Sequence, residues 1–191
     1  MRRIGITGGI GSGKSVVSRL LRIMGYSVYD TDSEAKRLME SSLGVVQKLS
    51  ECFGRDIYHN GRLNRGLLSS RVFGESDKIV LLNSIVHPVV RFDFYRWSES
   101  LNEEICFVES AILYESRFDE LVDEVWTVTA PEELRISRVR QRSGLTEEEI
   151  KKRMAAQLSE EEKQRRAAHI IWNDGNVSVI HRVLSLLKSL E

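Results

Sequence analysis

Short apolar runs separated by stretches of helical spacing predict the elements at the start of the chain. Residues 4–7 have the pattern of a short buried strand, and apolar residues recur at helical spacing over 14–24. A second short strand is predicted at 26–29, followed by a polar helix that runs through residue 40. Strand and helix therefore alternate, which is typical of an α/β protein.

The middle of the chain has a different pattern. Over 42–101 the apolar residues keep helical spacing and no buried strand is evident, so we predict an all-helical insertion. Strand patterns return at 105–108, at 125–128 and more weakly at 170–172, and an amphipathic helix is predicted at 177–190. Strands that alternate with helices imply right-handed crossovers and a parallel sheet of about five strands, in an α/β sandwich of three layers.

The segment 8–15 reads GGIGSGKS and satisfies GxxxxGK followed by Ser or Thr, with a predicted strand before it and a helix after it. Glycines let successive amides over 11–15 point at a β-phosphate, and the positive end of the helix favours the anion. We expect Lys14 to bridge the β- and γ-phosphates of ATP and Ser15 to bind Mg²⁺. The predicted ATP-binding residues of this loop are Gly11, Ser12, Gly13, Lys14, Ser15 and Val16.

Asp32 follows the second predicted strand and is a candidate general base. A carboxylate there can orient an acceptor hydroxyl and take its proton, a role that contributes roughly 10²- to 10⁴-fold in rate. The alternative is that Asp32 is the N-cap of a helix beginning near Ser33. Asp30 is a candidate helper near the metal.

Arg135, Arg138 and Arg142 are spaced so that they share one face of a predicted helix, where like charges repel. A lid that covers ATP would supply the anion against this face, so we place Arg138 and Arg142 at the phosphates, with Arg142 in a catalytic role. The alternative is a solvated face whose arginines pair with nearby glutamates, namely Glu132, Glu133 and Glu147 to Glu149.

Two further candidates are less specific. Pro88 is predicted to restrict His87 to extended or turn geometry between helical stretches, and a lone histidine there is more often structural than functional. Glu109 and Glu115 flank the end of the third strand, where a carboxylate commonly holds Mg²⁺ through water. The sequence leaves open whether they are ordinary surface acids.

The balance of charges and the pattern of cysteines indicate which binding partners and which cellular compartment to expect. The chain of 191 residues has 28 basic and 28 acidic side chains, so we expect no attraction to nucleic acid or to a membrane surface. Its first apolar run is too short for a signal peptide or a membrane span. Cys52 and Cys106 form no CxxC pair, which favours reduced thiols and a cytoplasmic protein.

Several segments together resemble the dephospho-CoA kinase family over nearly the whole chain. They are TGGIGSGKS at the start, VYDTD at 28–32, HP at 87–88, AQLS at 156–159 and WNDG from 172. The resemblance implies a P-loop kinase that uses Mg-ATP to phosphorylate the ribose 3′-hydroxyl of dephospho-CoA, giving coenzyme A and ADP. ATP and dephospho-CoA are then the partners, and we expect a monomer or a weak homo-oligomer.

The resemblance also implies residue roles. Asp32 would be the base and Arg142 would contact the phosphates, while Arg65 and His87 would belong to the acceptor side and Asn173 would lie by the adenine of ATP. The chain departs from the family pattern in several places, namely Val16 for Thr, Glu109-Ser110-Ala111 for an Asp-hydrophobic-Pro step, Ser143 for Asp and His169 for Asp.

We therefore predict a single P-loop kinase domain over 1–191. Its core comprises about 1–40 and 103–191, its helical acceptor-side insertion about 42–101, and its lid about 131–165. The main alternative is another small-molecule or nucleoside monophosphate kinase, because a P-loop specifies the donor and says little about the acceptor. A GTP-dependent switch is disfavoured because no NKxD segment is present.

Overall fold

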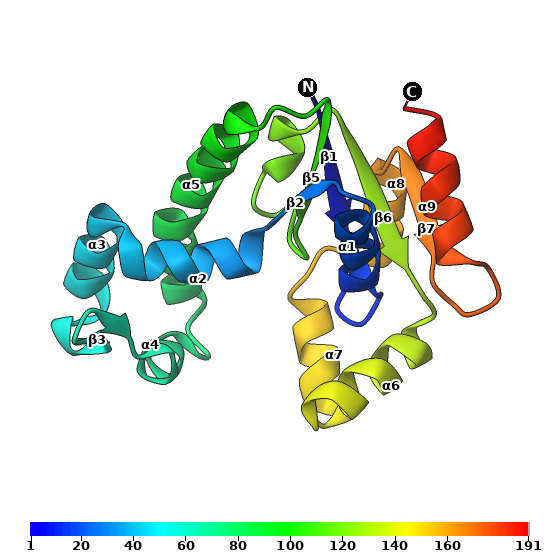
Figure 1. Cartoon of the computed structure of the whole chain (residues 1–191). Helices are drawn as coiled ribbons and strands as arrows, with labels where there is room; N and C mark the ends of the chain where they lie inside the picture. The colour runs from blue at the N-terminus through cyan, green and yellow to red at the C-terminus, as the bar shows by residue number, and fades with distance from the viewer. Residues whose placement is uncertain (191) are drawn as a thin grey trace. The chain divides into compact units, whose positions relative to one another are not determined.

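The computed structural model describes residues 1–190 and contains two compact units (Figure 1). The core unit comprises Met1–Tyr29 together with the residues from Leu101 onward, and the helical unit comprises Asp30–Ser100. The sequence pattern predicts that the helical insertion begins near residue 42, whereas the helical unit of the structure begins at Asp30. The unit begins at Asp30 because helix α2 (Thr31–Ser41) packs on other helices of the helical unit, and Tyr58 Oη donates to the carbonyl of Met39 at 2.6 Å.

The core unit is built on one five-stranded sheet. Its strands are β1 (Arg2–Thr7), β2 (Ser27–Asp30), β5 (Ile105–Glu109), β6 (Glu124–Thr129) and β7 (His169–Trp172). Their order is β2-β5-β1-β6-β7, with β1 parallel to β5 and β6, and β6 parallel to β7. The predicted fold class, an α/β sandwich with about five parallel strands, is confirmed, and each predicted strand is present.

Helices and loops cover both faces of this sheet. Helices α1 (Lys14–Ile23) and α9 (Val179–Lys188) pack on the face that carries Ile4, Ile6 and Trp126. Strand residues alternate between faces, and Gly5 on the opposite face lies against Leu113, so close that a Cβ on Gly5 would be 2.6 Å from its side chain. Helix α8 (Glu160–Arg166) also packs on β6, and η2 (Phe118–Leu121) contacts β1.

Two helices of the core unit connect β6 to α8. They are α6 (Glu132–Ser143) and α7 (Glu147–Ala155), which pack on each other and to which we give the name lid helices. The segment expected to form the lid, 131–165, extends into α8. Because α8 buries Lys163 completely beside the sheet, it belongs to the packed core.

The helical unit contains α2, α3 (Leu43–Phe53), η1 (Arg55–Ile57), α4 (Arg65–Val72) and α5 (Ser76–Ser100), packed around a core that includes Leu49 and Phe53. Its sequence pattern predicted helices alone. A short hairpin is also present, with strands of two residues each, β3 (Tyr58–His59) and β4 (Arg62–Leu63). Asn60 and Gly61 form its turn with positive φ, as a tight hairpin turn requires.

Pro88 lies inside α5, which runs without interruption over 25 residues. The prediction that Pro88 keeps His87 in extended or turn geometry is therefore wrong. A proline inside a helix costs about 3 kcal/mol, and burial of the apolar face of α5, including Ile85, Val90 and Phe94, offsets this cost. Within residues 1–190, no helix has both the length and the apolar character that a bilayer span requires.

Candidate active site

The loop between β1 and α1 presents backbone amides at the start of a helix. Gly13 has φ +99° and is the N-cap of α1. The amide of Ser12 donates to the carbonyl of Gly9 at 3.1 Å, whereas the amides of Gly11, Gly13 and Ser15 donate to no other group in residues 1–190. Free amides at a positive helix end form an anion-binding site, as the sequence predicted for the phosphate loop.

Lys14 lies across its own loop, because its Nζ donates to the carbonyls of Gly8 at 2.8 Å and Gly9 at 3.1 Å. Ser15 is exposed in the first turn of α1, and its hydroxyl has no partner within the described chain. Val16 is 56% exposed, and its amide donates to the carbonyl of Gly13. Lys14 and Ser15 are therefore placed at the same helix terminus as the free amides.

Asn173 joins the phosphate loop to a lid helix. Its Nδ2 donates to the carbonyl of Ser12 at 2.9 Å, and its Oδ1 accepts a long hydrogen bond from Arg138 at 3.5 Å. Both ends of the amide are thus engaged, so contact with an adenine would require one of these bonds to be exchanged. The structure brings Asn173 and Arg138, two of the predicted ATP-binding residues, to the phosphate loop.

The close approach of Asn173 explains why position 13 is a glycine. A Cβ on Gly13 would lie 2.0 Å from Asn173 Nδ2, and φ +99° is strained for any L side chain. We expect Gly13→Ala to lower the free energy of unfolding by about 1–3 kcal/mol and to weaken Mg-ATP binding at least tenfold, measured by calorimetry. Gly25→Ala is the matched control, since Gly25 has φ +93° and no atom within 4 Å of an added Cβ. Equal loss of ATP affinity in both variants would contradict this role.

The three arginines of α6 do not have equivalent surroundings. Arg135 is only 5% exposed, and its Nη1 forms an ion pair with Glu160 Oε1 at 2.8 Å. Arg138 contacts Asn173, and Arg142 is exposed in the last turn of α6 without an ion pair in the described part of the chain. The anion beside Arg135 is therefore an internal carboxylate. The alternative pairing with the glutamates of α6 and α7 is also wrong for Arg135.

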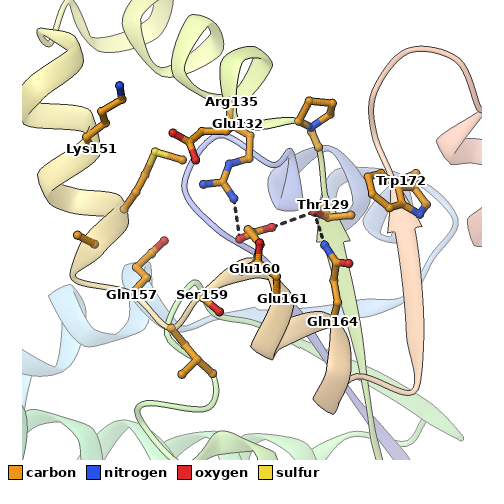
Figure 2. A pocket seen from close by; sticks show the side chains of 15 residues that line it. Thr129, Glu132, Arg135, Lys151, Gln157, Ser159, Glu160, Glu161, Gln164 and Trp172 are labelled. Carbon is orange, nitrogen blue, oxygen red and sulfur yellow. Dashed lines mark hydrogen bonds and ion pairs between the residues drawn. The ribbon is translucent and has the colours of Figure 1, made fainter.

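A cavity of about 610 Å³ separates the lid helices from α8 (Figure 2). Glu132 and Arg135 of α6 line it, as do Lys151 of α7, Gln164 of α8 and the 45%-exposed ring of Trp172. Near its centre, the dashed lines in Figure 2 connect Glu160 to Arg135 and Thr129.

Polar residues that the sequence pattern did not single out tie the start of α8 to the rest of the core unit. Glu160 Oε2 accepts from Thr129 Oγ1 at 2.9 Å, and Gln157 Oε1 accepts from the amide of Ile10 at 3.0 Å. Lys163 Nζ donates to the carbonyl of Ala111 at 2.9 Å. Burial lowers the pKa of Lys163. The AQLS segment marked this region in the family resemblance, but only the fold shows what Gln157 contacts.

Glu109 is the last residue of β5 and is in register with Ile6, so it lies at the sheet edge where β1 leads into the phosphate loop. Whether Glu109 contacts a metal through water stays a prediction. Glu115 has a different role, because its Oε1 accepts from the amide of Leu158 at 2.7 Å. Among residues 1–190, no cluster of three or more His, Cys, Asp or Glu side chains could hold a metal ion.

In the helical unit, Asp30 and not Asp32 caps α2. Asp30 Oδ1 accepts from the amides of Asp32 and Ser33 at 3.0 and 3.2 Å, and its Oδ2 accepts from the hydroxyl of Ser33. The alternative reading of Asp32 as an N-cap is therefore wrong, since α2 begins one residue before it. The Asp32 carboxylate is exposed in the first turn of α2 and forms no hydrogen bond or ion pair among the described residues.

The other acceptor-side candidates lie on α4 and α5. Arg65, the first residue of α4, donates from Nη2 to Glu40 Oε1 at 3.2 Å, near the end of α2. Asp32 and Glu40 are eight residues apart on α2, which corresponds to roughly 12 Å along the helix axis. His87 is half-buried on α5, four residues before Arg91.

Burial, with a smaller contribution from Arg91, lowers the pKa of His87 from its ordinary value of 6.5. As the pH falls through 6.5 the unfolded chain takes up a proton first, so stability is lost and the loss is complete below the folded-state pKa. We expect His87→Asn to lose less stability between pH 8 and pH 5 than the parent chain, measured by urea denaturation. His59→Asn is the control, and identical pH profiles for the parent chain and His87→Asn would contradict the prediction.

Comparison with known proteins identifies close relatives. The dephospho-CoA kinase family profile matches residues 2–178. The dephospho-CoA kinases of Porphyromonas gingivalis and Bacteroides fragilis are 40% and 41% identical to the chain, over 100% and 98% of it and over 95% and 92% of their own lengths. The crystal structure of TT1252 from Thermus thermophilus superimposes with a TM-score of 0.87 at 36% identity, covering 99% of this chain and 97% of that one.

Proposed function

The chain belongs to the dephospho-CoA kinase family, and we propose how its residues transfer the γ-phosphoryl group of ATP to the ribose 3′-hydroxyl of dephospho-CoA. The products are coenzyme A and ADP. The observation that carries the residue assignment is the phosphate loop, where free amides, Lys14 and Ser15 meet at the N-terminus of α1. Family membership supplies the acceptor, which a phosphate loop does not specify.

On the donor side, the amides of Gly11, Gly13 and Ser15 bind the β-phosphate, and Lys14 exchanges the carbonyls of Gly8 and Gly9 for the β- and γ-phosphates. The exposed Ser15 hydroxyl fits the coordination of Mg²⁺, and Glu109 is placed to hold one of its waters. When bound, Mg²⁺ neutralises charge that develops on the phosphoryl oxygens.

On the acceptor side, Asp32 orients the 3′-hydroxyl and accepts its proton, since its carboxylate is exposed and has no other partner among the described residues. Arg65 binds an anionic part of dephospho-CoA in exchange for Glu40, and a guanidinium matches the geometry of a diphosphate. Asp32 and Glu40, the partner of Arg65, are separated along α2 by a distance that suits a long acceptor. His87, with its lowered pKa, is neutral at pH 7 and acts through hydrogen bonds.

The lid contributes Arg142, whose exposed guanidinium reaches the transferring phosphoryl group, and Arg138, which acts with Asn173 at the phosphate loop. Closure of such a lid excludes water from the reacting phosphate. Asn173 is well placed to exchange its bond with Arg138 for one with the adenine.

The reaction is tested by incubating the protein with Mg-ATP and one acceptor at a time: dephospho-CoA, AMP, CMP, shikimate or adenosine. We expect ADP release and a product of the mass of coenzyme A with dephospho-CoA alone, and no product with Lys14→Met. ADP release with another acceptor would favour a different small-molecule kinase. If no acceptor led to release of ADP, the proposed kinase reaction would be wrong.

The state of the cysteines bears on the compartment in which the enzyme works. Both cysteines are free, exposed Cys52 and buried Cys106, and burial raises the pKa of the Cys106 thiol to about 11. Free thiols are typical of a reducing compartment, so we place the protein in the cytoplasm. Its partners are ATP and dephospho-CoA, with no role for nucleic acid or membrane, and we expect a monomer or a weak homo-oligomer in solution.

A further inference from the structure

The segment that follows the lid helices contacts the phosphate loop directly. We call residues 157–160 the return segment. Its first residue, Gln157, accepts a hydrogen bond from the amide of Ile10 at 3.0 Å. This amide lies just before the group of free amides in the phosphate loop, so Gln157 stabilises the loop without occupying a donor needed by ATP.

The last residue of the return segment approaches the same loop. A Cβ on Gly9 would lie 2.2 Å from Glu160 Oε1 and 2.8 Å from Arg135 Nη1, and a Cβ on Gly11 would lie 2.5 Å from the carbonyl of Arg135. Glu160 and Arg135 are themselves joined by the buried ion pair at 2.8 Å. Arg135, near the start of the first lid helix α6, and the return segment, which follows α7, therefore both abut the phosphate loop.

These contacts are polar, and a cavity lies beside them. The cavity of about 610 Å³ lies between Lys151 and Met154 of α7 and the residues of α8 (Figure 2). Arg135 Nε is buried without a hydrogen-bond partner in the described chain. The hydrogen bonds and ion pairs that bridge this space help to hold the lid helices on the loop.

We propose that Gln157 and Glu160 are positioning residues that hold the phosphate loop in its ATP-binding conformation and couple it to the lid helices. The proposal rests on the proposed function in that the loop binds ATP. The Glu160 carboxylate lies against Gly9 and joins two other groups, because it forms an ion pair with Arg135 of α6 and accepts a hydrogen bond from Thr129 at the end of β6. A loop that is already ordered binds ATP without a further loss of conformational entropy.

Gln157→Met tests the first residue, because methionine has a similar length and no acceptor for the Ile10 amide. We expect the Kd of Mg-ATP, measured by calorimetry without acceptor, to rise about tenfold, the effect expected when one hydrogen bond that holds the loop is lost. The KM of dephospho-CoA should stay unchanged. Gln164→Met is the matched control, since Gln164 lines the same cavity and donates to Thr129 Oγ1 at 3.1 Å but forms no hydrogen bond with the phosphate loop among residues 1–190. Equal ATP affinities in the parent chain and both variants would overturn the proposal.

Glu160→Gln tests the second residue and separates positioning from stability. It keeps an acceptor for Thr129 but leaves Arg135 as a buried, unpaired charge, so both stability and ATP affinity should fall. Combining it with Arg135→Met removes the unpaired charge. We expect the double variant to regain stability in urea denaturation but not its ATP affinity. Recovery of ATP affinity together with stability would show a merely structural role and overturn the proposal, whereas failure of the parent chain to bind ATP would instead remove the proposed function.

Discussion

Asp32→Asn is expected to lower kcat by roughly 10²- to 10⁴-fold, the contribution of a positioned general base. The KM of ATP should change little, because Asp32 belongs to the acceptor side and makes no contact in the described chain that the substitution would break. Single-turnover kinetics with saturating Mg-ATP and dephospho-CoA measure the chemical step directly. Asparagine keeps the size of the side chain and removes its ability to accept a proton.

Asp77→Asn is the matched control for this variant. Asp77 is also an exposed aspartate in the first turn of a helix of the helical unit, so the substitution makes the same change of charge in a similar position. Its kcat should equal that of the parent chain. If Asp32→Asn turned over as fast as Asp77→Asn, another residue would have to be the base.

The phosphate loop was predictable because all of its chemistry lies in one short segment. GGIGSGKS specifies the glycines, Lys14 and Ser15, and the apolar patterns on either side specify the strand and helix that present them. The central strands β1, β5 and β6 were predictable for a related reason, since most of their residues are buried and include runs of apolar side chains. Local sequence carries this information without knowledge of the fold.

The contacts that support the loop were not predictable, because they join residues distant in sequence. Arg135 and Glu160 are separated by two helices, and each lies in a charged segment that would ordinarily be solvated. Lys163 belongs to a run of polar residues, yet it is fully buried and donates to the carbonyl of Ala111. A charged side chain is almost never fully buried without a partner, and the sequence does not show which partner it has.

Two local rules failed for different physical reasons. The restriction that Pro88 places on His87 was outweighed by the burial of the apolar face of α5. The cap of α2 is Asp30 and not Asp32, a shift within the usual uncertainty of a helix boundary read from sequence. That shift matters for function, because it leaves the carboxylate of Asp32 without a structural role.

Arg142→Ala is expected to lower kcat by roughly 10³- to 10⁵-fold, the effect of an arginine that stabilises the transferring phosphoryl group. Its guanidinium is exposed at the end of α6 and is not held by an ion pair within residues 1–190, so stability should be unaffected. A contact made only in the transition state lowers kcat and leaves the KM of ATP nearly unchanged. Arg138→Ala should behave differently and raise the KM of ATP, because Arg138 acts through Asn173 on the phosphate loop.

Arg140→Ala is the control for the Arg142 variant, since Arg140 is an exposed arginine in the same last turn of α6. Its kcat should match that of the parent chain, and Arg142→Lys should recover part of the lost rate by restoring the charge without the planar fork. If kcat fell by a similar small factor in the Arg140 and Arg142 variants, the arginines at the end of α6 would contribute only a non-specific positive potential. In that case the charge on the phosphoryl group must be met by the amides of the phosphate loop and by Lys14, and lid closure would serve mainly to exclude water.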